Sequence, residues 1–166
     1  IGDVDNADHV ATLVPGRTTN CRDSSADNVT YAKNLRQAAV DQGKIGASKV
    51  ATIAWMNYHA PQGGPDAEVA MASLAREGAD PLRKFATGIH SWRSERGMDV
   101  HQSIIPHSYG STTAGIAMRD IGKDVVDDFA YTGSPGAGVA SVGTLGVDKD
   151  HVWVSGITHL DWVRGM

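Results

Sequence analysis

The chain contains a single cysteine, Cys21, among its 166 residues. It therefore has no cysteine pair for an internal disulfide and no cysteine set for a thiolate metal site. No apolar run approaches the ~18 residues of a membrane-spanning helix. Basic residues are also few, since 15 Lys and Arg stand against 19 Asp and Glu and give a formal net charge of −4. Because a dedicated nucleic-acid-binding protein is expected to be basic, this charge argues against that class.

The composition that is present is typical of a globular domain. Apolar residues make up 41% and charged residues 20% of the chain, close to the averages for soluble domains. A chain of this length fits one domain and is long enough to form a core without disulfides. The sequence begins at Ile1 rather than Met and stops soon after an apolar segment. We therefore expect a single domain over residues 1–166 that lacks its N- and C-terminal parts.

Apolar runs and helical periodicities alternate along the chain. Five short apolar runs predict strands at residues 9–14, 49–55, 102–107, 125–132 and 151–155. Apolar positions at helical spacing predict helices at residues 24–42, 66–76, 80–93, 112–121 and 139–147, with Gly78 ending the second and Pro81 opening the third. The alternation predicts a doubly wound α/β fold, in which helices cover both faces of a mostly parallel five-stranded sheet.

A serine lies in the turn that follows the third expected strand. Residues 106–110 read Pro-His-Ser-Tyr-Gly, and a helix is expected directly afterwards. In open α/β sheets ligands bind beyond the carboxyl ends of the strands, and a Ser at the tip of a strand–turn–helix connection is typical of a hydrolase nucleophile. Gly110 provides the small residue that this turn needs after the Ser, whereas Pro106 departs from the usual Gly before it. The alternative is an ordinary helix start, in which Ser108 or Ser111 only satisfies backbone N–H groups.

Segments along nearly the whole chain resemble an actinobacterial family of α/β-hydrolases, a group of largely uncharacterised proteins regarded as esterases. They are residues 2–10, 14–16, 54–61, 107–112 (HSYGST) and 132–136 (TGSPG), of which the last two are the most specific. The Ser turn followed by a strand ending in Gly-Ser-Pro also resembles the class 3 lipases. The resemblance implies an α/β-hydrolase core with the strand order second-first-third-fourth-fifth. It also implies a catalytic Ser, Asp and His in that chain order.

Residue by residue, the resemblance assigns the nucleophile to Ser108 and the acid to Asp161, which follows the fifth expected strand. An ordinary helix cap is the alternative role for Asp161. The family's His lies further downstream, and no position matches it in the five residues after Asp161. Either the sequence is truncated, or the His comes from elsewhere, or this form is inactive. His159 is the nearer candidate for the base, and His107 the weaker one, because adjacent side chains on a strand point apart.

An ester hydrolase also needs backbone donors for the oxyanion. The N–H of Tyr109, directly after the nucleophile, is expected to be one donor. The second is expected in the loop after the first strand, at Gly16, Arg17 or Thr18. Arg17 departs from the Gly- and Thr-rich loop of the family, and it either holds an acidic substrate group or extends into solvent. His59 follows the second strand and is expected to line the pocket.

The remaining sequence patterns do not indicate a further binding or catalytic site. Gly136-x-Gly138 follows a strand but lacks the third Gly of a dinucleotide-binding loop. The acidic residues 3–8 lack the central Gly and closing Glu of a calcium loop, so no metal or other cofactor is expected. Asp127 and Asp128 are expected to be solvated, at the sheet edge opposite Ser108. The remaining histidines are expected to be solvated or core residues without a site role: His9, His90, His101 and His151.

The sequence therefore predicts a serine hydrolase that cleaves a carboxylic ester, either a small molecule or a lipid. A non-catalytic α/β module that binds a ligand is the alternative, favoured by Pro106, Arg17 and the missing base. A nucleotide-binding domain is a third and weaker interpretation. No nucleic-acid partner and no membrane span are expected, and the sequence leaves the oligomeric state and the cellular compartment open.

Overall fold

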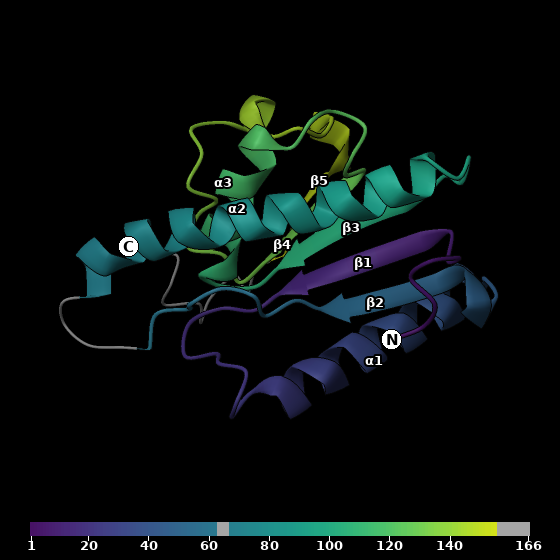
Figure 1. Cartoon of the computed structure of the whole chain (residues 1–166). Helices are drawn as coiled ribbons and strands as arrows, with labels where there is room; N and C mark the ends of the chain where they lie inside the picture. Colours follow the sequence, from purple (N-terminus) through teal and green to yellow (C-terminus); the bar gives the residue numbers. More distant parts are fainter. Residues whose placement is uncertain (63–66, 156–166) are drawn as a thin grey trace.

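The computed structural model describes residues 1–62 and 67–155, and for residues 67–71 the backbone alone. Within these residues the strands alternate with three long helices and three short 3₁₀ helices (Figure 1). The strands are β1 (His9–Val14), β2 (Val50–Ala54), β3 (His101–Pro106), β4 (Asp128–Thr132) and β5 (Val152–Ser155). The helices are α1 (Ser25–Gly43), η1 (Ala47–Lys49), α2 (Ala67–Ser94), α3 (Gly110–Asp120), η2 (Val142–Thr144) and η3 (Lys149–His151).

All five strands belong to one parallel sheet with the order β2-β1-β3-β4-β5. The predicted fold class and strand order are therefore confirmed. The chain passes from β1 to β2 on one side and then returns to β3 on the other side of β1. The carboxyl ends of β1 and β3 thus form the point where the winding direction reverses, which is where open α/β sheets bind their ligands.

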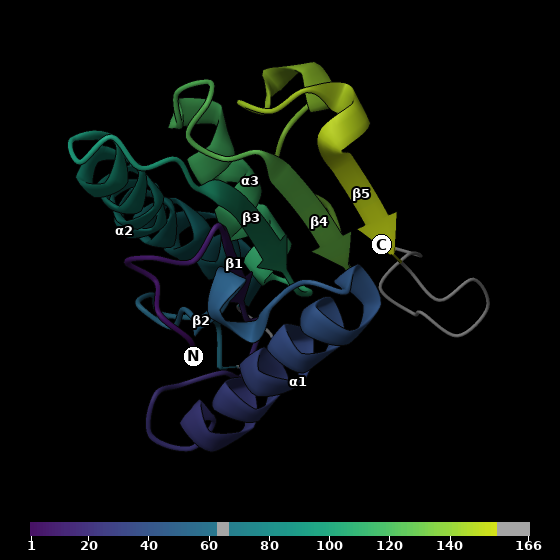
Figure 2. The same ribbon diagram turned by 90° about the vertical axis from the view of Figure 1, so that its right-hand side faces the viewer.

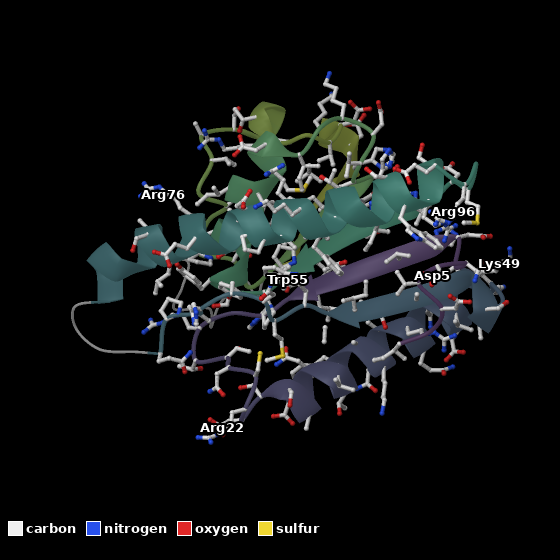
Figure 3. The ribbon with its side chains drawn as sticks, in the orientation of Figure 1. Asp5, Arg22, Lys49, Trp55, Arg76 and Arg96 are labelled. Carbon is white, nitrogen blue, oxygen red and sulfur yellow. The ribbon has the colours of Figure 1, made fainter. Side chains whose placement is uncertain are left out.

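The helices form a layer on each face of the sheet. Helix α1 covers one face, and α2 and α3 lie side by side on the other (Figures 1 and 2). The main core lies between the sheet and the α2–α3 layer, where Leu82, Ile104, Met118 and Phe129 are almost completely buried. Trp55 lies inside the molecule, whereas charged side chains such as Arg22 and Arg76 lie at its periphery (Figure 3).

Helix α2 corrects one prediction, because it runs unbroken through Gly78 and Pro81 for 28 residues. Gly78 does not end the helix but allows it to pack closely. A Cβ atom at this position would lie 2.8 Å from the Tyr58 Cβ and 2.9 Å from the Thr113 Cγ2. A proline inside a helix lowers the stability of the helix by about 3 kcal/mol. The burial of Leu82 and other apolar α2 side chains against the sheet outweighs this loss.

The helix predicted at residues 139–147 is also wrong, since only the short η2 forms there. Gly136 and Gly138 have positive φ angles of 137° and 63°, which are not helical. Gly146 fixes the far end of the segment, because its N–H donates to the Met118 carbonyl over 3.0 Å. A Cβ at Gly146 would lie only 2.6 Å from the Ile121 carbonyl oxygen. The segment therefore follows the end of α3 as a closely packed loop.

Asp128 is not a solvated side chain, contrary to the expectation, although it does lie at the edge opposite Ser108. Its carboxylate is bonded to the His101 Nε2 over 2.5 Å and to the His151 Nδ1 over 2.9 Å. Burial acts to raise the pKa of Asp128, but hydrogen bonds from His101, His151 and Trp153 outweigh it and lower the pKa below its ordinary value. One carboxylate thus joins the amino ends of β3, β4 and β5.

This cluster predicts a pH dependence of stability. The hydrogen bond to Asp128, with further contributions from the Asp128, Asp148 and Asp127 charges, raises the pKa of His151 above its ordinary value of 6.5. A group whose pKa is raised by folding stabilises the folded state when it is protonated. This stabilisation is complete at pH values below the pKa of the unfolded state, and it disappears as the pH rises through the pKa of the folded state. We expect His151→Gln to lower the Tm by about 1–2 °C at about pH 6 and by less at about pH 8.5.

Thermal unfolding of both proteins at the two pH values measures this effect. His90→Gln, on α2 and away from the cluster, is the matched control and should show no such pH-dependent difference. An equal loss of Tm at both pH values for His151→Gln would show that the ring contributes packing rather than charge.

Candidate active site

Ser108 occupies a tight turn between β3 and α3. Its φ angle of 51° lies in the left-handed region, which a non-glycine residue adopts only when the surrounding structure enforces it. The Ser108 N–H donates to the Thr132 carbonyl over 3.0 Å, and the Ser108 carbonyl accepts from the Ser111 N–H over 2.9 Å. The Gly110 N–H closes the turn on the His107 carbonyl over 2.9 Å. The backbone at Ser108 is therefore fixed on both sides.

Two glycines allow the elements around Ser108 to approach each other. A Cβ at Gly110 would lie 2.5 Å from the carbonyl oxygens of both Val14 and Pro15, so only Gly lets α3 begin against the end of β1. A Cβ at Gly16 would lie 2.7 Å from the Ser108 Cβ and 3.2 Å from its Oγ. The loop after β1 therefore runs directly beside the Ser108 hydroxyl.

Pro106 stands where a Gly is usual before the nucleophile. It fits the sheet because the hydrogen-bond ladder between β3 and β4 is interrupted there. The ladder pairs Ser103 with Asp128 and Ile104 with Phe129, and resumes only as an isolated bridge between His107 and Thr132. A missing backbone N–H at Pro106 is thus tolerated in a central strand. The Thr132 hydroxyl donates to the Pro106 carbonyl over 3.0 Å and joins the strands at this point.

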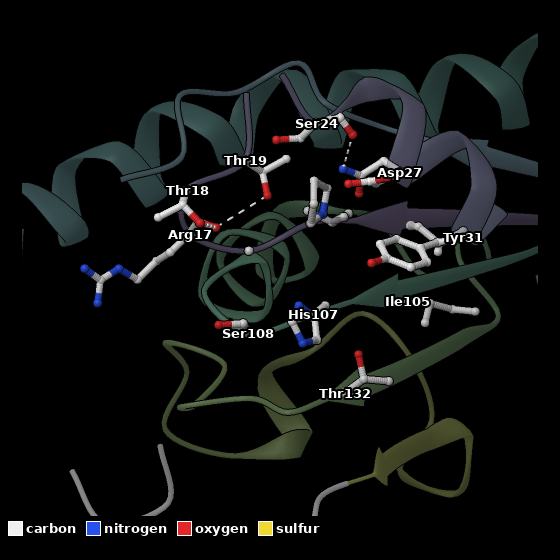
Figure 4. Close-up of a pocket in the computed structure, with 15 residues that line it drawn as sticks. Arg17, Thr18, Thr19, Ser24, Asp27, Tyr31, Ile105, His107, Ser108 and Thr132 are labelled. Carbon is white, nitrogen blue, oxygen red and sulfur yellow. Dashed lines mark hydrogen bonds between the residues drawn. The ribbon is translucent and has the colours of Figure 1, made fainter. Parts of the chain in front are cut away.

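A cavity of about 530 Å³ lies beside Ser108, between the carboxyl ends of β1, β3 and β4 and the first turns of α1 (Figure 4). Its wall includes hydroxyl and ionisable side chains as well as Leu13, Val14 and Ile105. Of the described histidines, only His107 lines this cavity. The His107 ring and the Ser108 hydroxyl point in different directions (Figure 4), as expected for neighbouring residues at a strand end.

Of the three N–H groups in the loop after β1 that were expected as oxyanion donors, at Gly16, Arg17 and Thr18, two remain candidates. The Thr18 N–H already donates to the Pro61 carbonyl over 2.8 Å, so it does not face a substrate. The N–H groups of Gly16 and Arg17 have no hydrogen-bond partner among the described residues. Arg17 is half-buried, and its Nε is enclosed without a partner in the described part of the chain. Its guanidinium extends away from the other residues of the cavity (Figure 4).

Tyr109 begins the helical part of the turn and buries its ring beneath it. The ring stacks on Tyr58, with centroids 6.4 Å apart, and Tyr58 stacks in turn on Trp55 at 5.8 Å. Burial raises the pKa of Tyr109 to about 12 and that of Tyr58 still further. Both phenols therefore stay protonated at neutral pH and are not candidates for a general base.

The predicted site residues fall into three groups. The structure brings Gly16, Arg17, Thr18, His107 and Ser108 together around one cavity, with Tyr109 directly after Ser108. Asp161 and His159 lie outside the described residues. His59 does not line this cavity but a separate one of about 750 Å³ between the loops after β1 and β2.

Comparison with known proteins matches residues 1–166 to a family described as alpha/beta hydrolase. The chain belongs to the alpha/beta hydrolase family. Uncharacterised proteins of Mycobacterium bovis and Mycobacterium tuberculosis are each 34% identical to it over 157 residues, which is 92% of this chain and 57% of the relative. A second uncharacterised M. tuberculosis protein is 33% identical over 158 residues, or 93% of this chain and 23% of the relative.

This alpha/beta hydrolase therefore spans 57% of the length of the first two relatives and 23% of the length of the third. Their mycobacterial origin agrees with the actinobacterial resemblance. In the described part of the hydrolase, no helix combines the length and apolar character of a membrane span. The same residues contain no group of three or more His, Cys, Asp or Glu arranged to hold a metal ion.

Proposed function

We propose that this alpha/beta hydrolase is a serine hydrolase that cleaves carboxylic esters through an acyl-enzyme on Ser108. The observation that supports it best is the conformation of Ser108. Its φ of 51° at a strand–helix turn agrees with the strained backbone expected of a nucleophile elbow, and the turn lies where the winding of the sheet reverses. An ordinary helix-capping serine has no need of this strain. The N-cap residue of α3 is Tyr109 rather than Ser108, and no side-chain capping bond is present at this helix start within the described residues.

In the proposed reaction, the Ser108 Oγ attacks the ester carbonyl carbon and gives its proton to a base. The carbonyl oxygen becomes an oxyanion, which accepts hydrogen bonds from the Tyr109 N–H and from an N–H of the Gly16–Arg17 segment. The base returns the proton to the departing alcohol as the C–O bond breaks. Water then attacks the acyl-enzyme in the same way, releasing the carboxylic acid and restoring the Ser108 hydroxyl.

The proposal assigns the acid to Asp161 and keeps His159 as the base candidate within this chain. An imidazole that bridges the two groups needs two hydrogen bonds of ~2.6–3.2 Å, which places the Asp161 carboxylate roughly 6–9 Å from the Ser108 Oγ. His107 is the second base candidate, since it lines the same cavity. A His downstream of Asp161, as the family resemblance implies, is the third.

The cavity beside Ser108 suits a short ester. Its volume is about 530 Å³, and Thr18, Tyr31 and Thr132 add hydroxyl groups to its wall. The Thr18 and Thr132 hydroxyls donate to the Arg17 and Pro106 carbonyls over 2.7 and 3.0 Å, and their oxygens can still accept a hydrogen bond from a polar substrate. p-Nitrophenyl acetate is therefore the substrate of choice for a first assay.

A fluorophosphonate reagent tests the proposal, because it forms a covalent bond only with an activated serine. We expect one adduct per chain, placed on Ser108 by mass spectrometry of the digested protein, and hydrolysis of p-nitrophenyl acetate above the buffer rate. A folded protein that is neither labelled nor active would overturn the proposal and favour the non-catalytic binding module. An adduct on a different serine would move the nucleophile away from the β3–α3 turn.

A further inference from the structure

The loop after β1 is held by the loop after β2. The Tyr58 hydroxyl donates to the Pro15 carbonyl, and the Thr18 N–H donates to the Pro61 carbonyl over 2.8 Å. Further along, the Gln62 Nε2 donates to the Thr19 carbonyl over 3.2 Å. Since β1 and β2 are parallel neighbours, their carboxyl ends bring both loops to the same edge of the sheet. The first loop is the one that runs beside the Ser108 Oγ.

Tyr58 is itself fixed by its surroundings. Its ring lies between Trp55 and Tyr109, with interplanar angles of 13° and 11°. Helix α2 passes so close to it that a Cβ at Gly78 would lie 2.8 Å from the Tyr58 Cβ. Burial raises the pKa of Tyr58, so its hydroxyl remains a donor at neutral pH. A phenol held this firmly fixes the direction of the carbonyl to which it donates.

The Pro15 carbonyl and the Gly16 N–H belong to one planar peptide unit, in which the two groups point in opposite directions. A bond that holds the Pro15 carbonyl therefore also sets the direction of the Gly16 N–H. The Pro15 oxygen points toward Tyr58 and Gly110, on the α2–α3 side of the sheet. The Gly16 N–H is thus directed to the other side, where the cavity beside Ser108 lies and where it has no partner among the described residues.

We propose that Tyr58 is a positioning residue, whose hydroxyl holds the Pro15–Gly16 peptide so that the Gly16 N–H serves as the second oxyanion donor. This inference rests on the proposed ester hydrolysis at Ser108. It narrows the second donor to one amide and assigns a role to a residue outside the cavity. Tyr58 acts through the backbone and does not touch the substrate.

Tyr58→Phe tests the inference, because it removes the hydroxyl and keeps the stacked ring. We expect kcat for p-nitrophenyl acetate to fall about tenfold, as a misaligned donor weakens transition-state stabilisation, while KM stays close to wild type. A trifluoromethyl ketone, which forms an oxyanion on the serine, should lose affinity by about the same factor. Amide hydrogen exchange at Thr18, whose N–H donates to the Pro61 carbonyl, should become about tenfold faster.

Tyr131→Phe is the matched control. Tyr131 is a buried tyrosine on β4 whose hydroxyl makes no hydrogen bond within the described residues, and it lies outside both loops. Its kcat, inhibitor affinity and loop exchange should match wild type. Gln62→Ala releases the same loop at a more exposed contact, and it provides a milder test, with an expected loss of about threefold in kcat, should Tyr58→Phe fail to fold.

The outcomes separate the two proposals. Labelling of wild-type Ser108 together with an unchanged kcat in Tyr58→Phe would overturn the positioning role and leave the esterase function intact. An equal loss of kcat in Tyr131→Phe would overturn it as well, because the effect would then not depend on the loop. Absence of wild-type labelling and activity would overturn the proposed function and the catalytic role of Tyr58 with it. Loop exchange would then report only whether the hydroxyl holds Pro15 in place.

Discussion

Ser108→Ala is expected to lower kcat for p-nitrophenyl acetate by roughly 10⁴- to 10⁶-fold and to abolish fluorophosphonate labelling. The reason is chemical, since Ala has no oxygen with which to form the acyl-enzyme. The substitution removes only the Oγ atom and leaves the backbone bonds to Thr132 and Ser111 in place. Thermal unfolding should therefore change little, because Ser and Ala pay a similar cost for a positive φ.

Ser103→Ala provides the control for this result. Ser103 lies on the same strand but away from the turn, opposite Asp128 in the ladder. Its activity and labelling should remain at the wild-type level. Retention of more than about a tenth of the wild-type kcat in Ser108→Ala would show that another residue is the nucleophile and that the β3–α3 turn serves a structural purpose.

Gly110→Ala is expected to destabilise the fold by about 3 kcal/mol. The added methyl would lie 2.5 Å from the carbonyl oxygens of Val14 and Pro15. Both are backbone atoms at the end of a central strand and cannot turn aside, so α3 must move away from β1. Urea unfolding measures the loss, and p-nitrophenyl acetate hydrolysis should fall as well, because the displaced helix start carries Ser108 away from Gly16.

Gly88→Ala is the matched control within another helix. No atom lies within 4 Å of a Cβ built at Gly88 in α2. The same substitution there should stabilise the protein by about 0.5–1 kcal/mol, because Ala favours the helix more than Gly does. A similar response at Gly88 and Gly110 would contradict the steric explanation.

The sheet and its order could be predicted from the sequence because the signals are local or carried by the resemblance. Each strand is a short apolar run, and the HSYGST segment locates the turn of Ser108. Helix α2 could not be predicted as one element, because Gly78 reads locally as a helix end. Its actual role depends on Tyr58 and Thr113, which lie 20 and 35 residues away in the sequence.

The same limit applies to the site. The need for Gly110 can be recognised from the local sequence pattern. In contrast, the hydrogen bond from the Thr18 N–H to the Pro61 carbonyl depends on the loop that follows another strand. The role inferred for Tyr58 is of this kind too. The only signal that pointed to it was the inclusion of residues 54–61 among the segments that resemble the hydrolase family. The prediction for Asp128 was wrong for a related reason, since its partners His101 on β3 and His151 in η3 lie more than 20 residues away in the sequence.

The interruption of the sheet at Pro106 makes two positions depend on each other. Pro106 cannot donate to β4, and the Thr132 hydroxyl supplies a bond between the strands from the opposite direction. Glycine at position 106 would restore a backbone donor and make the bond between the strands less dependent on the hydroxyl at position 132. Valine at position 132 should therefore destabilise this strand end more beside proline than beside glycine. Related sequences should therefore show covariation of positions 106 and 132, and engineered variants of this strand end should change both residues together.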